Sequence, residues 1–248
     1  MTLVFVHGNP ECASIWDPLL AELGRDAVVA LSPPGFGAPV PDGFGATSDD
    51  YLAWLVGELE SIGGTVDLVG HDWGGGHVAR VAATRPDLIR SYAVDLFGCI
   101  APDYVWHDMA QIWQTPGDGE ALVDAMMSAP IDDRVAGYVG VGMTPDVARA
   151  CAEAGGDEMG RCILALYRSA VQPKMADWGR ELVAAERRPA LAIVATEDPY
   201  TGGKDRVLQS AARVDAQVAL LDGLGHWWML EDPARGAAAL RDFVDQLA

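Results

Sequence analysis

The chain has 248 residues, of which 50% are hydrophobic and 8% aromatic, and it carries a formal net charge of −19. This length is sufficient for one domain of ordinary enzyme size with a substantial buried core. The large acidic excess argues against nucleic acid or an anionic membrane as a partner and indicates a soluble protein.

Four cysteines, Cys12, Cys99, Cys151 and Cys162, show no close pairing of the kind that binds metals. Because no secretory leader precedes them, we expect reduced thiols in a cytoplasmic protein. No apolar run approaches the roughly 18–20 residues that are needed to span a bilayer. We therefore expect no membrane partner and no metal.

The N-terminal part of the chain alternates between predicted strands and predicted helices. Residues 2–6 form a continuous apolar run, which is typical of a strand buried on both faces of a parallel sheet. Further strands are predicted over 27–31, 66–69 and 91–97, and helices over 14–23, 49–62 and 77–85. Such alternation predicts a right-handed, mostly parallel α/β sheet.

Two turns in this part carry recognisable motifs. The first strand runs directly into His7-Gly8-Asn9-Pro10, and Gly70, Asp72 and Gly74 have the spacing of a nucleophile elbow with aspartate in place of serine. The glycines are needed because a sharp strand-to-helix turn strains its central residue and crowds its neighbours. The turn presents that residue at the amino end of a helix, where backbone N–H groups favour negative charge. A carboxylate placed there attacks saturated carbon and leaves an alkyl ester.

Strand patterns disappear between residues 98 and 187. Six of the eight methionines and three tryptophans stand here, among helical stretches and glycine-rich turns such as residues 136–142. Soft, adaptable side chains suit the wall of an apolar pocket. We predict a helical cap over 98–187, inserted into a core formed by residues 1–97 and 188–248.

The sheet then resumes, with strands predicted over 190–195 and 216–221. The first of these leads into Asp198 and the second into His226, and a helix over 233–247 closes the chain. Because the carboxyl ends of parallel strands meet at one edge of a sheet, residues far apart in sequence can come together there.

With these motifs the chain resembles the α/β-hydrolase superfamily. Residues 70–75, Gly-His-Asp-Trp-Gly-Gly, are similar to the elbow of its epoxide hydrolases and haloalkane dehalogenases. The resemblance implies the α/β-hydrolase fold with a helical cap and no cofactor. The family's usual first two strands are absent here, so we expect a mostly parallel sheet of about six strands.

The resemblance also implies roles for the motif residues, whose chain order matches the family's. Asp72 is the implied nucleophile, and His226 is the base that activates water against the Asp72 ester. Asp198 is the acid that orients the imidazole and stabilises its charged form. The backbone N–H groups of Asn9 and Trp73 are expected to hold the carbonyl oxygen of the ester.

Asp95 is a second candidate for the acid. It lies at the end of the fourth predicted strand, where one branch of the dehalogenases places its catalytic carboxylate, but one residue short of that position. Asp198, in a Thr-Glu-Asp-Pro sequence after the next strand, is therefore the better candidate.

The two substrate classes differ in the leaving group that the site must stabilise. Epoxide opening produces an alkoxide, and the epoxide hydrolases supply two cap tyrosines for it. Tyr167 stands in a Leu-Tyr-Arg-Ser segment that resembles the one bearing the first. The position of the second falls near Met109, with Tyr104 and His107 as neighbouring candidates. These three residues and Trp113 form the predicted substrate-binding set.

A halide instead needs N–H donors, and one dehalogenase group uses the pair that Asn9 and the Trp73 indole provide here. Tyr167, Pro10–Glu11 and Gly74–Gly75 favour the epoxide hydrolases. We therefore expect water to open a small apolar epoxide to a diol through the elbow ester, with haloalkane dehalogenation as the alternative. A non-catalytic binding protein is least favoured, because a binder needs no water-activating histidine. The expected assembly is a monomer or homodimer.

Overall fold

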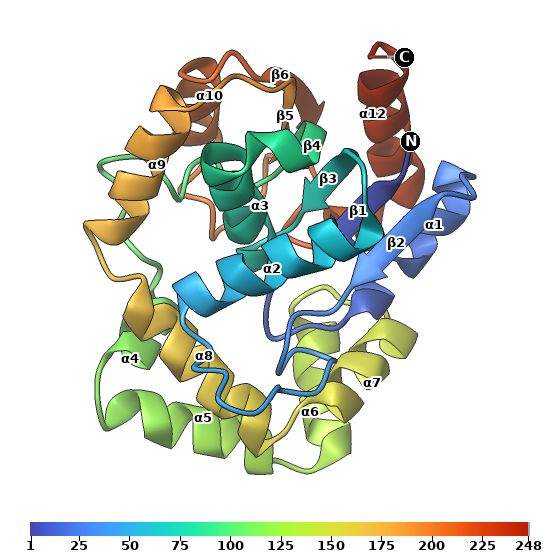
Figure 1. Ribbon diagram of the computed structural model, residues 1–248. Coiled ribbons are helices and arrows are strands. Elements are labelled where there is room, and N and C mark those ends of the chain that lie inside the picture. The colour runs from blue at the N-terminus through green and yellow to red at the C-terminus, as the bar shows by residue number, and fades with distance from the viewer. Residues whose placement is uncertain (248) are drawn as a thin grey trace.

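The computed structural model of the protein describes residues 1–247, in which six parallel strands form one sheet. Across the sheet the strand order is β2-β1-β3-β4-β5-β6 (Figure 1). The strands are β1 (Leu3–Val6), β2 (Val28–Leu31), β3 (Val66–Gly70), β4 (Ile89–Val94), β5 (Ala190–Ala195) and β6 (Gln217–Leu221). Their number and direction confirm the sequence prediction.

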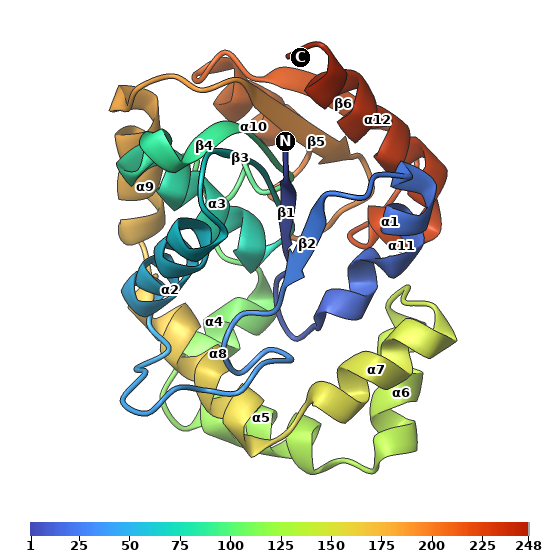
Figure 2. The same ribbon diagram turned by 45° about the vertical axis from the view of Figure 1, so that its right-hand side comes forward.

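Helices join the strands and cover both faces of the sheet (Figure 2). Around the sheet they are η1 (Ala13–Trp16), α1 (Asp17–Leu23), α2 (Ser48–Ile62), α3 (Trp73–Thr84), η2 (Pro86–Leu88), α10 (Lys204–Ala212), α11 (Trp228–Glu231) and α12 (Pro233–Asp245), where η marks a 3₁₀-helix. Between β4 and β5 they are α4 (Asp108–Gln114), α5 (Asp118–Ser128), α6 (Ile131–Gly140), α7 (Pro145–Ala154), α8 (Asp157–Ser169) and α9 (Lys174–Ala184).

Strand β1 explains why a continuous apolar run indicates burial on both faces. Val4 and Val6 pack in a hydrophobic cluster with α2 and α3, whereas Leu3 and Phe5 pack in a second cluster with α1 and α12. All four side chains are buried. Each such side chain contributes about 1.5–3 kcal/mol when it leaves water, so both helical layers are held to the sheet.

The sheet has a topological switch point between β1 and β3. The chain leaves β1 towards β2 on one side, whereas β4, β5 and β6 follow on the other side of β3. Val6 at the end of β1 pairs with Gly70 at the end of β3, so the loops that follow these strands start side by side. In open α/β sheets the crevice at such a point is where ligands bind.

Helices α4 to α8 lie beyond the carboxyl ends of the strands, in the lower part of Figures 1 and 2. We call residues 98–187 the helical segment. Its last helix, α9, packs instead against α3, where the Arg80 guanidinium carbon lies 4.6 Å from the centroid of the Trp178 ring.

One expectation for the helical segment is wrong. Residues 136–142 were predicted as a turn, but residues up to Gly140 belong to α6. Each glycine costs a helix about 1 kcal/mol relative to alanine, and packing of α6 on α7 offsets that cost. Glycine content alone was therefore a poor guide to a helix that another helix supports.

Two boundaries near the predicted site also differ from the prediction. Strand β4 ends at Val94, so Asp95 follows the strand instead of lying within it. Helix α3 begins at Trp73, immediately after Asp72, although residues 74–76 are glycines with low helix propensity. The prediction began this helix only at residue 77 because the glycines conceal its first turn.

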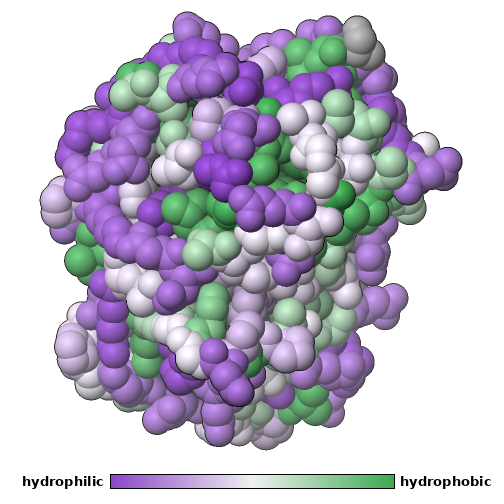
Figure 3. Space-filling view, in the orientation of Figure 1, coloured by the Kyte–Doolittle hydropathy of each residue, from purple (hydrophilic) through white to green (hydrophobic). Residues whose placement is uncertain are grey.

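The visible surface is largely polar. Figure 3 shows a face that is mostly hydrophilic, with small apolar areas scattered over it. Among the described residues, no helix combines the length and the apolar character that crossing a lipid bilayer requires.

Candidate active site

Asp72 stands in the sharp turn between β3 and α3. Its backbone has φ 49° and ψ −125°, which is rare for a residue with a side chain. Neighbouring glycines make the turn possible, because a Cβ at Gly74 would lie 2.1 Å from the carbonyl oxygen of Val6. Strain of this kind costs about 1–3 kcal/mol and persists only where packing holds it, typically at functional sites.

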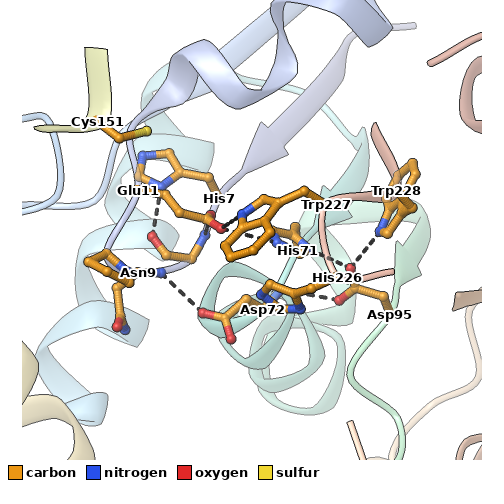
Figure 4. A network of polar contacts seen from close by, with 12 residues as sticks. His7, Asn9, Glu11, His71, Asp72, Asp95, Cys151, His226, Trp227 and Trp228 are labelled. Atoms are coloured by element: carbon orange, nitrogen blue, oxygen red, sulfur yellow. Dashed lines mark hydrogen bonds and ion pairs between the residues drawn. The ribbon is translucent and has the colours of Figure 1, made fainter. Parts of the chain in front are cut away.

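The turn after β1 approaches the Asp72 carboxylate closely. The backbone N–H of Asn9 donates to Asp72 Oδ1 at 3.1 Å (Figure 4), and the nearby backbone of Trp73 also favours the charged form of this carboxylate. A Cβ at Gly8 would lie 2.1 Å from the same oxygen, so glycine is required there. Burial raises the pKa of Asp72 to about 6, because the buried charge loses its hydration.

His226 and Asp198 form a hydrogen-bonded pair beside Asp72. Nδ1 of His226 lies 2.9 Å from Oδ2 of Asp198, and both residues are buried. Burial opposes both charges, but the Asp198 charge and this hydrogen bond raise the pKa of His226, and His226 lowers the pKa of Asp198. With Nδ1 engaged, Nε2 is the nitrogen left for a water molecule. His226 and Asp72 line the same cavity.

Asp95, the other candidate acid, forms its hydrogen bonds with residues other than His226. Its Oδ2 lies 2.5 Å from Nδ1 of His71 and accepts the indole N–H of Trp228 at 2.9 Å, while its Oδ1 accepts the backbone N–H of Asp72 at 3.1 Å. The structure therefore brings Asp198, and not Asp95, to His226. Asp95 instead supports the backbone of the elbow.

Glu11, His71 and Asp95 form a second buried set of polar groups, which we call the His71 network. Nε2 of His71 lies 3.2 Å from Oε1 of Glu11, so each ring nitrogen faces a carboxylate. Burial favours the neutral ring, but the charges of Asp95 and Glu11 outweigh it and raise the pKa of His71 well above its ordinary value. This is the arrangement of an imidazolium that donates from both nitrogens.

The His71 network joins the loops that carry Asn9, Asp72 and His226 (Figure 4). Glu11 accepts the backbone N–H of Gly8 at 3.0 Å and the indole N–H of Trp227 at 2.6 Å. It thereby connects the turn after β1 with the loop of His226. The ring centroids of His71 and His226 are 4.5 Å apart, and the charge of His71 opposes protonation of His226.

Three of these residues could also be considered as metal ligands. Glu11, His71 and His226 each offer one ligand atom, and these atoms lie within 4.8 Å of one another. A metal ligand must offer a lone pair, however, and both nitrogens of His71 already face carboxylates. The three residues therefore fit a polar network better than a metal centre.

A cavity of about 400 Å³ opens beside Asp72, between the sheet edge and the helical segment. Asp72, Asn9 and His226 form its polar end. The remaining wall is mostly apolar and includes Met109, Trp113, Leu122, Met126, Met127 and Tyr167. Its volume and lining suit a small organic molecule.

The predicted substrate-binding residues divide between two spaces. His107, Met109 and Trp113 line the large cavity, whereas Tyr104 lines a smaller space of about 30 Å³ beside it, which His107 also borders. The Tyr104 hydroxyl donates to the backbone carbonyl of Tyr200 at 2.8 Å. The proton of this hydroxyl is therefore already used in a hydrogen bond to the backbone.

Tyr167 lies in the wall of the cavity that contains Asp72. Its side chain is 2% exposed, and its ring packs edge-on against Trp73 with centroids 5.2 Å apart. Burial and the charge of Asp72 raise the pKa of Tyr167 well above its ordinary value, so its hydroxyl remains protonated. Tyr167 can therefore act as a hydrogen-bond or proton donor.

His107 presents a second neutral donor. Its Nδ1 accepts the backbone N–H of Ala110 at 3.2 Å, capping helix α4. Burial and the nearby His226 lower the pKa of His107 to about 4. A neutral ring whose Nδ1 accepts carries its proton on Nε2, so His107 offers an Nε2–H group.

Asn9 is also one of the residues that line the cavity. Within residues 1–247 neither atom of its amide has a hydrogen-bond partner, although both atoms are buried. An unpaired buried polar group costs about 1–3 kcal/mol, which a ligand that accepts from the amide can recover.

His71 is not among the site residues predicted from the sequence, and Glu11 appears there only as part of a family pattern. Both signals were visible, because Glu11 follows the first turn directly and His71 lies inside the elbow. Tyr200 was also missed; its ring lies 4.8 Å from that of His226 and 5.0 Å from that of His107, measured between centroids. Only the pairing of β1 with β3 reveals that Glu11 and His71 meet.

Comparison with known proteins gives a family model and several relatives. Residues 3–239 match the model described as an alpha/beta hydrolase family. A haloalkane dehalogenase of Bradyrhizobium diazoefficiens is 29% identical over 141 residues, which cover 49% of this chain and 45% of that protein. A 2-(acetamidomethylene)succinate hydrolase of Mesorhizobium japonicum is 24% identical over 250 residues, which cover 98% of this chain and 87% of that protein. The chain thus spans less than half of the dehalogenase.

Solved structures share the fold at low sequence identity. A haloalkane dehalogenase of Agrobacterium tumefaciens C58 has a TM-score of 0.77 and 18% identity, over 100% of this chain and 90% of that chain. An E-2-(acetamidomethylene)succinate hydrolase has a TM-score of 0.74 and 20% identity, over 98% of this chain and 91% of that chain. At these identities the likeness establishes the fold and not the reaction.

Proposed function

Because this chain belongs to the α/β-hydrolase family and carries aspartate at the elbow, we propose that it opens epoxides to diols through an ester on Asp72. One observation carries the proposal. A single cavity is lined by a carboxylate nucleophile, a histidine base (His226) and two neutral donors, Tyr167 and His107.

In the first step the Asp72 carboxylate attacks an epoxide carbon. A carbon–oxygen bond to Asp72 forms while the ring carbon–oxygen bond breaks, and the electron pair of that bond moves to the ring oxygen. The resulting alkoxide would be costly in an apolar cavity without a donor. Tyr167 supplies one, because its raised pKa keeps the hydroxyl protonated until the alkoxide develops.

His107 takes the place of the second donor. The Tyr104 hydroxyl is bound to a backbone carbonyl, whereas His107 lines the cavity and carries its proton on Nε2. Both donors hydrogen-bond the leaving oxygen and share its charge, and the alkoxide takes one proton, from the Tyr167 hydroxyl.

In the second step His226 takes a proton from water, and the oxygen of that water attacks the carbonyl carbon of the ester. Asp198 stabilises the imidazolium. The N–H groups of Asn9 and Trp73 hold the negative oxygen of the tetrahedral intermediate. When the intermediate collapses, the bond between the carbonyl carbon and the alkyl oxygen breaks, and the leaving oxygen takes the proton held by His226. The remaining proton of the new carboxylic acid returns to the Tyr167 oxygen, the diol leaves, and Asp72 is restored as a carboxylate with one oxygen from water.

Haloalkane dehalogenation is the second candidate, and the unpaired side-chain amide of Asn9 favours it. A departing halide needs N–H donors, and this amide and the Trp73 indole supply them. The dehalogenase relative supports the same reading. Both reactions share the ester on Asp72, so the leaving group alone distinguishes them.

The shared step is tested by trapping the ester. His226→Ala should accumulate an alkyl adduct on Asp72, visible by mass spectrometry after reaction with styrene oxide or 1-bromobutane. Its turnover should fall about 10²–10⁴-fold, as expected for loss of a positioned base. Asp72→Ala should give no adduct. If the His226 variant turns over at the wild-type rate, or the adduct lies on another residue, the mechanism is wrong.

Single-turnover rates of alkylation separate the two reactions. For an epoxide enzyme, Tyr167→Phe and His107→Asn should slow styrene oxide sharply. Asparagine retains the helix-capping acceptor of His107 while removing Nε2–H. Tyr92→Phe, a buried tyrosine outside the cavity lining, is the control. An epoxide rate unchanged in the first two variants, with a bromoalkane rate that collapses in Asn9→Ala, would instead establish the dehalogenase.

A further inference from the structure

Two cysteines face each other where the helical segment meets the core. The Sγ atoms of Cys12 and Cys151 lie 3.5 Å apart, although the residues are 139 positions apart in sequence. Cys12 precedes η1 directly and follows the turn that carries Asn9, whereas Cys151 belongs to α7. The side chain of Cys12 is 8% exposed, and Cys151 is fully buried.

Helices α6 and α7 are joined by residues 141–144 only, and we call them the α6–α7 hairpin. The hairpin supplies one wall of the large cavity through Arg134, Tyr138 and Val141. It is seated on the core by packing of α7 against η1 and by the Tyr138 hydroxyl, which donates to the Pro10 carbonyl at 2.9 Å. The thiol pair lies at this same contact between the hairpin and the core.

The two thiols differ in reactivity. A hydrogen bond from the Cys151 thiol lowers the pKa of Cys12, which favours its thiolate, and the pKa of Cys151 is raised in turn. The thiolate is the form that attacks peroxides and disulfides. Cys12 is also the more exposed of the two, so it is the thiol that a small oxidant reaches first.

We propose that Cys12 and Cys151 form a hydroperoxide-sensitive dithiol site, whose oxidation ties the α6–α7 hairpin covalently to the core. The Cys12 thiolate attacks a peroxide oxygen, the O–O bond breaks, and a sulfenic acid forms with release of water or an alcohol. The Cys151 sulfur then attacks the Cys12 sulfur; an S–S bond forms, the S–O bond breaks, and water leaves. The two thiols lose two electrons and two protons, and the peroxide gains them.

The change in geometry is small, because a disulfide needs its sulfur atoms about 2.05 Å apart. The bond would hold the hairpin next to the turn of Asn9 and so restrict movement of that cavity wall. The site depends neither on a substrate nor on the nature of the leaving group. Its test is therefore independent of the proposed function.

The experiment treats the full-length protein with hydrogen peroxide in the absence of substrate. The chain should lose two of its four thiols and about 2 Da of mass, with peptide mapping placing the link between Cys12 and Cys151. Cys12→Ser and Cys151→Ser should abolish the link, whereas Cys162→Ser should retain it. The oxidised protein should melt at a higher temperature than the reduced protein, and dithiothreitol should reverse the shift.

A second variant keeps the test independent of folding defects in the serine substitutions. Cys99→Ser/Cys162→Ser retains only the proposed pair, and peroxide should still form the same link in it. Stable oxygen adducts on Cys12 without a link, a link that includes Cys99 or Cys162, or no loss of thiols would each overturn the proposal.

Discussion

Individual side chains at the site carry charges that burial alone would suppress. His71 is fully buried, yet Glu11 and Asp95 raise its pKa well above its ordinary value. A pKa that is higher in the folded than in the unfolded chain contributes stability that is complete below about pH 6.5, the unfolded value. That contribution is lost as the pH rises through the folded pKa.

His71→Gln should therefore destabilise the protein, and the effect should depend on pH. Near pH 7 we expect a loss of about 3–5 kcal/mol in the free energy of unfolding, because two buried carboxylates lose their cation. The difference from wild type should shrink towards pH 10. His77→Gln is the control, because burial lowers the pKa of His77 to about 3 and its ring is neutral throughout this range. Urea unfolding at several pH values measures the free energy of unfolding of both variants. If the loss caused by His71→Gln stays constant up to pH 10, the His71 ring is not charged in the folded protein.

At the scale of elements, the first turn of α3 decides how closely the elbow approaches the sheet. Its three glycines are not equivalent. A Cβ at Gly74 would lie 2.1 Å from the Val6 carbonyl oxygen, whereas one at Gly76 would meet its nearest neighbour, Trp73, at 3.6 Å. The first distance is a clash with backbone, and the second is ordinary contact. Close packing against β1 therefore requires glycine at position 74, whereas no such contact requires it at position 76.

Gly74→Ala and Gly76→Ala should have opposite effects on stability. The first forces α3 away from β1 and should cost about 1–3 kcal/mol or more, as overpacking does. The second places alanine inside a helix and should be neutral or stabilise by up to about 1 kcal/mol. Thermal unfolding of the two variants checks this. Equal destabilisation by both would show that α3 does not need the close approach at Gly74.

For the whole molecule, the sheet edge and the helical segment together define which substrates fit. The polar end of the cavity comes from the loops after β1, β3 and β6, while Leu122 and Met126 of α5 contribute apolar wall. The reacting groups therefore belong to the loops of the sheet, whereas the helical segment limits the size of the substrate. A change in the helical layer should alter selection without altering the reacting groups.

Met126→Trp tests this division. The larger side chain should fill part of the cavity of about 400 Å³ and lower kcat/KM at least about 10-fold for a bulky aryl substrate, equivalent to about 1.4 kcal/mol. A small substrate of the same class should react at the wild-type rate. Met126→Leu nearly conserves volume and serves as the control. A parallel loss for large and small substrates would indicate that Met126 supports the reacting groups.

The amino-acid sequence was enough to predict the parallel sheet, the elbow and the positions of Asp72, Asp198 and His226 after separate strands. These are local signals, because apolar runs report burial and glycine spacing reports a sharp turn. Tertiary structure decided the rest: the partner of Asp95, the availability of His107 in place of Tyr104, the helix over residues 131–140 and the contact of Cys12 with Cys151. Each of these depends on where a strand ends or which elements pack together. Hydrophobic periodicity does not encode that information, because it identifies a buried face without identifying the element that covers it.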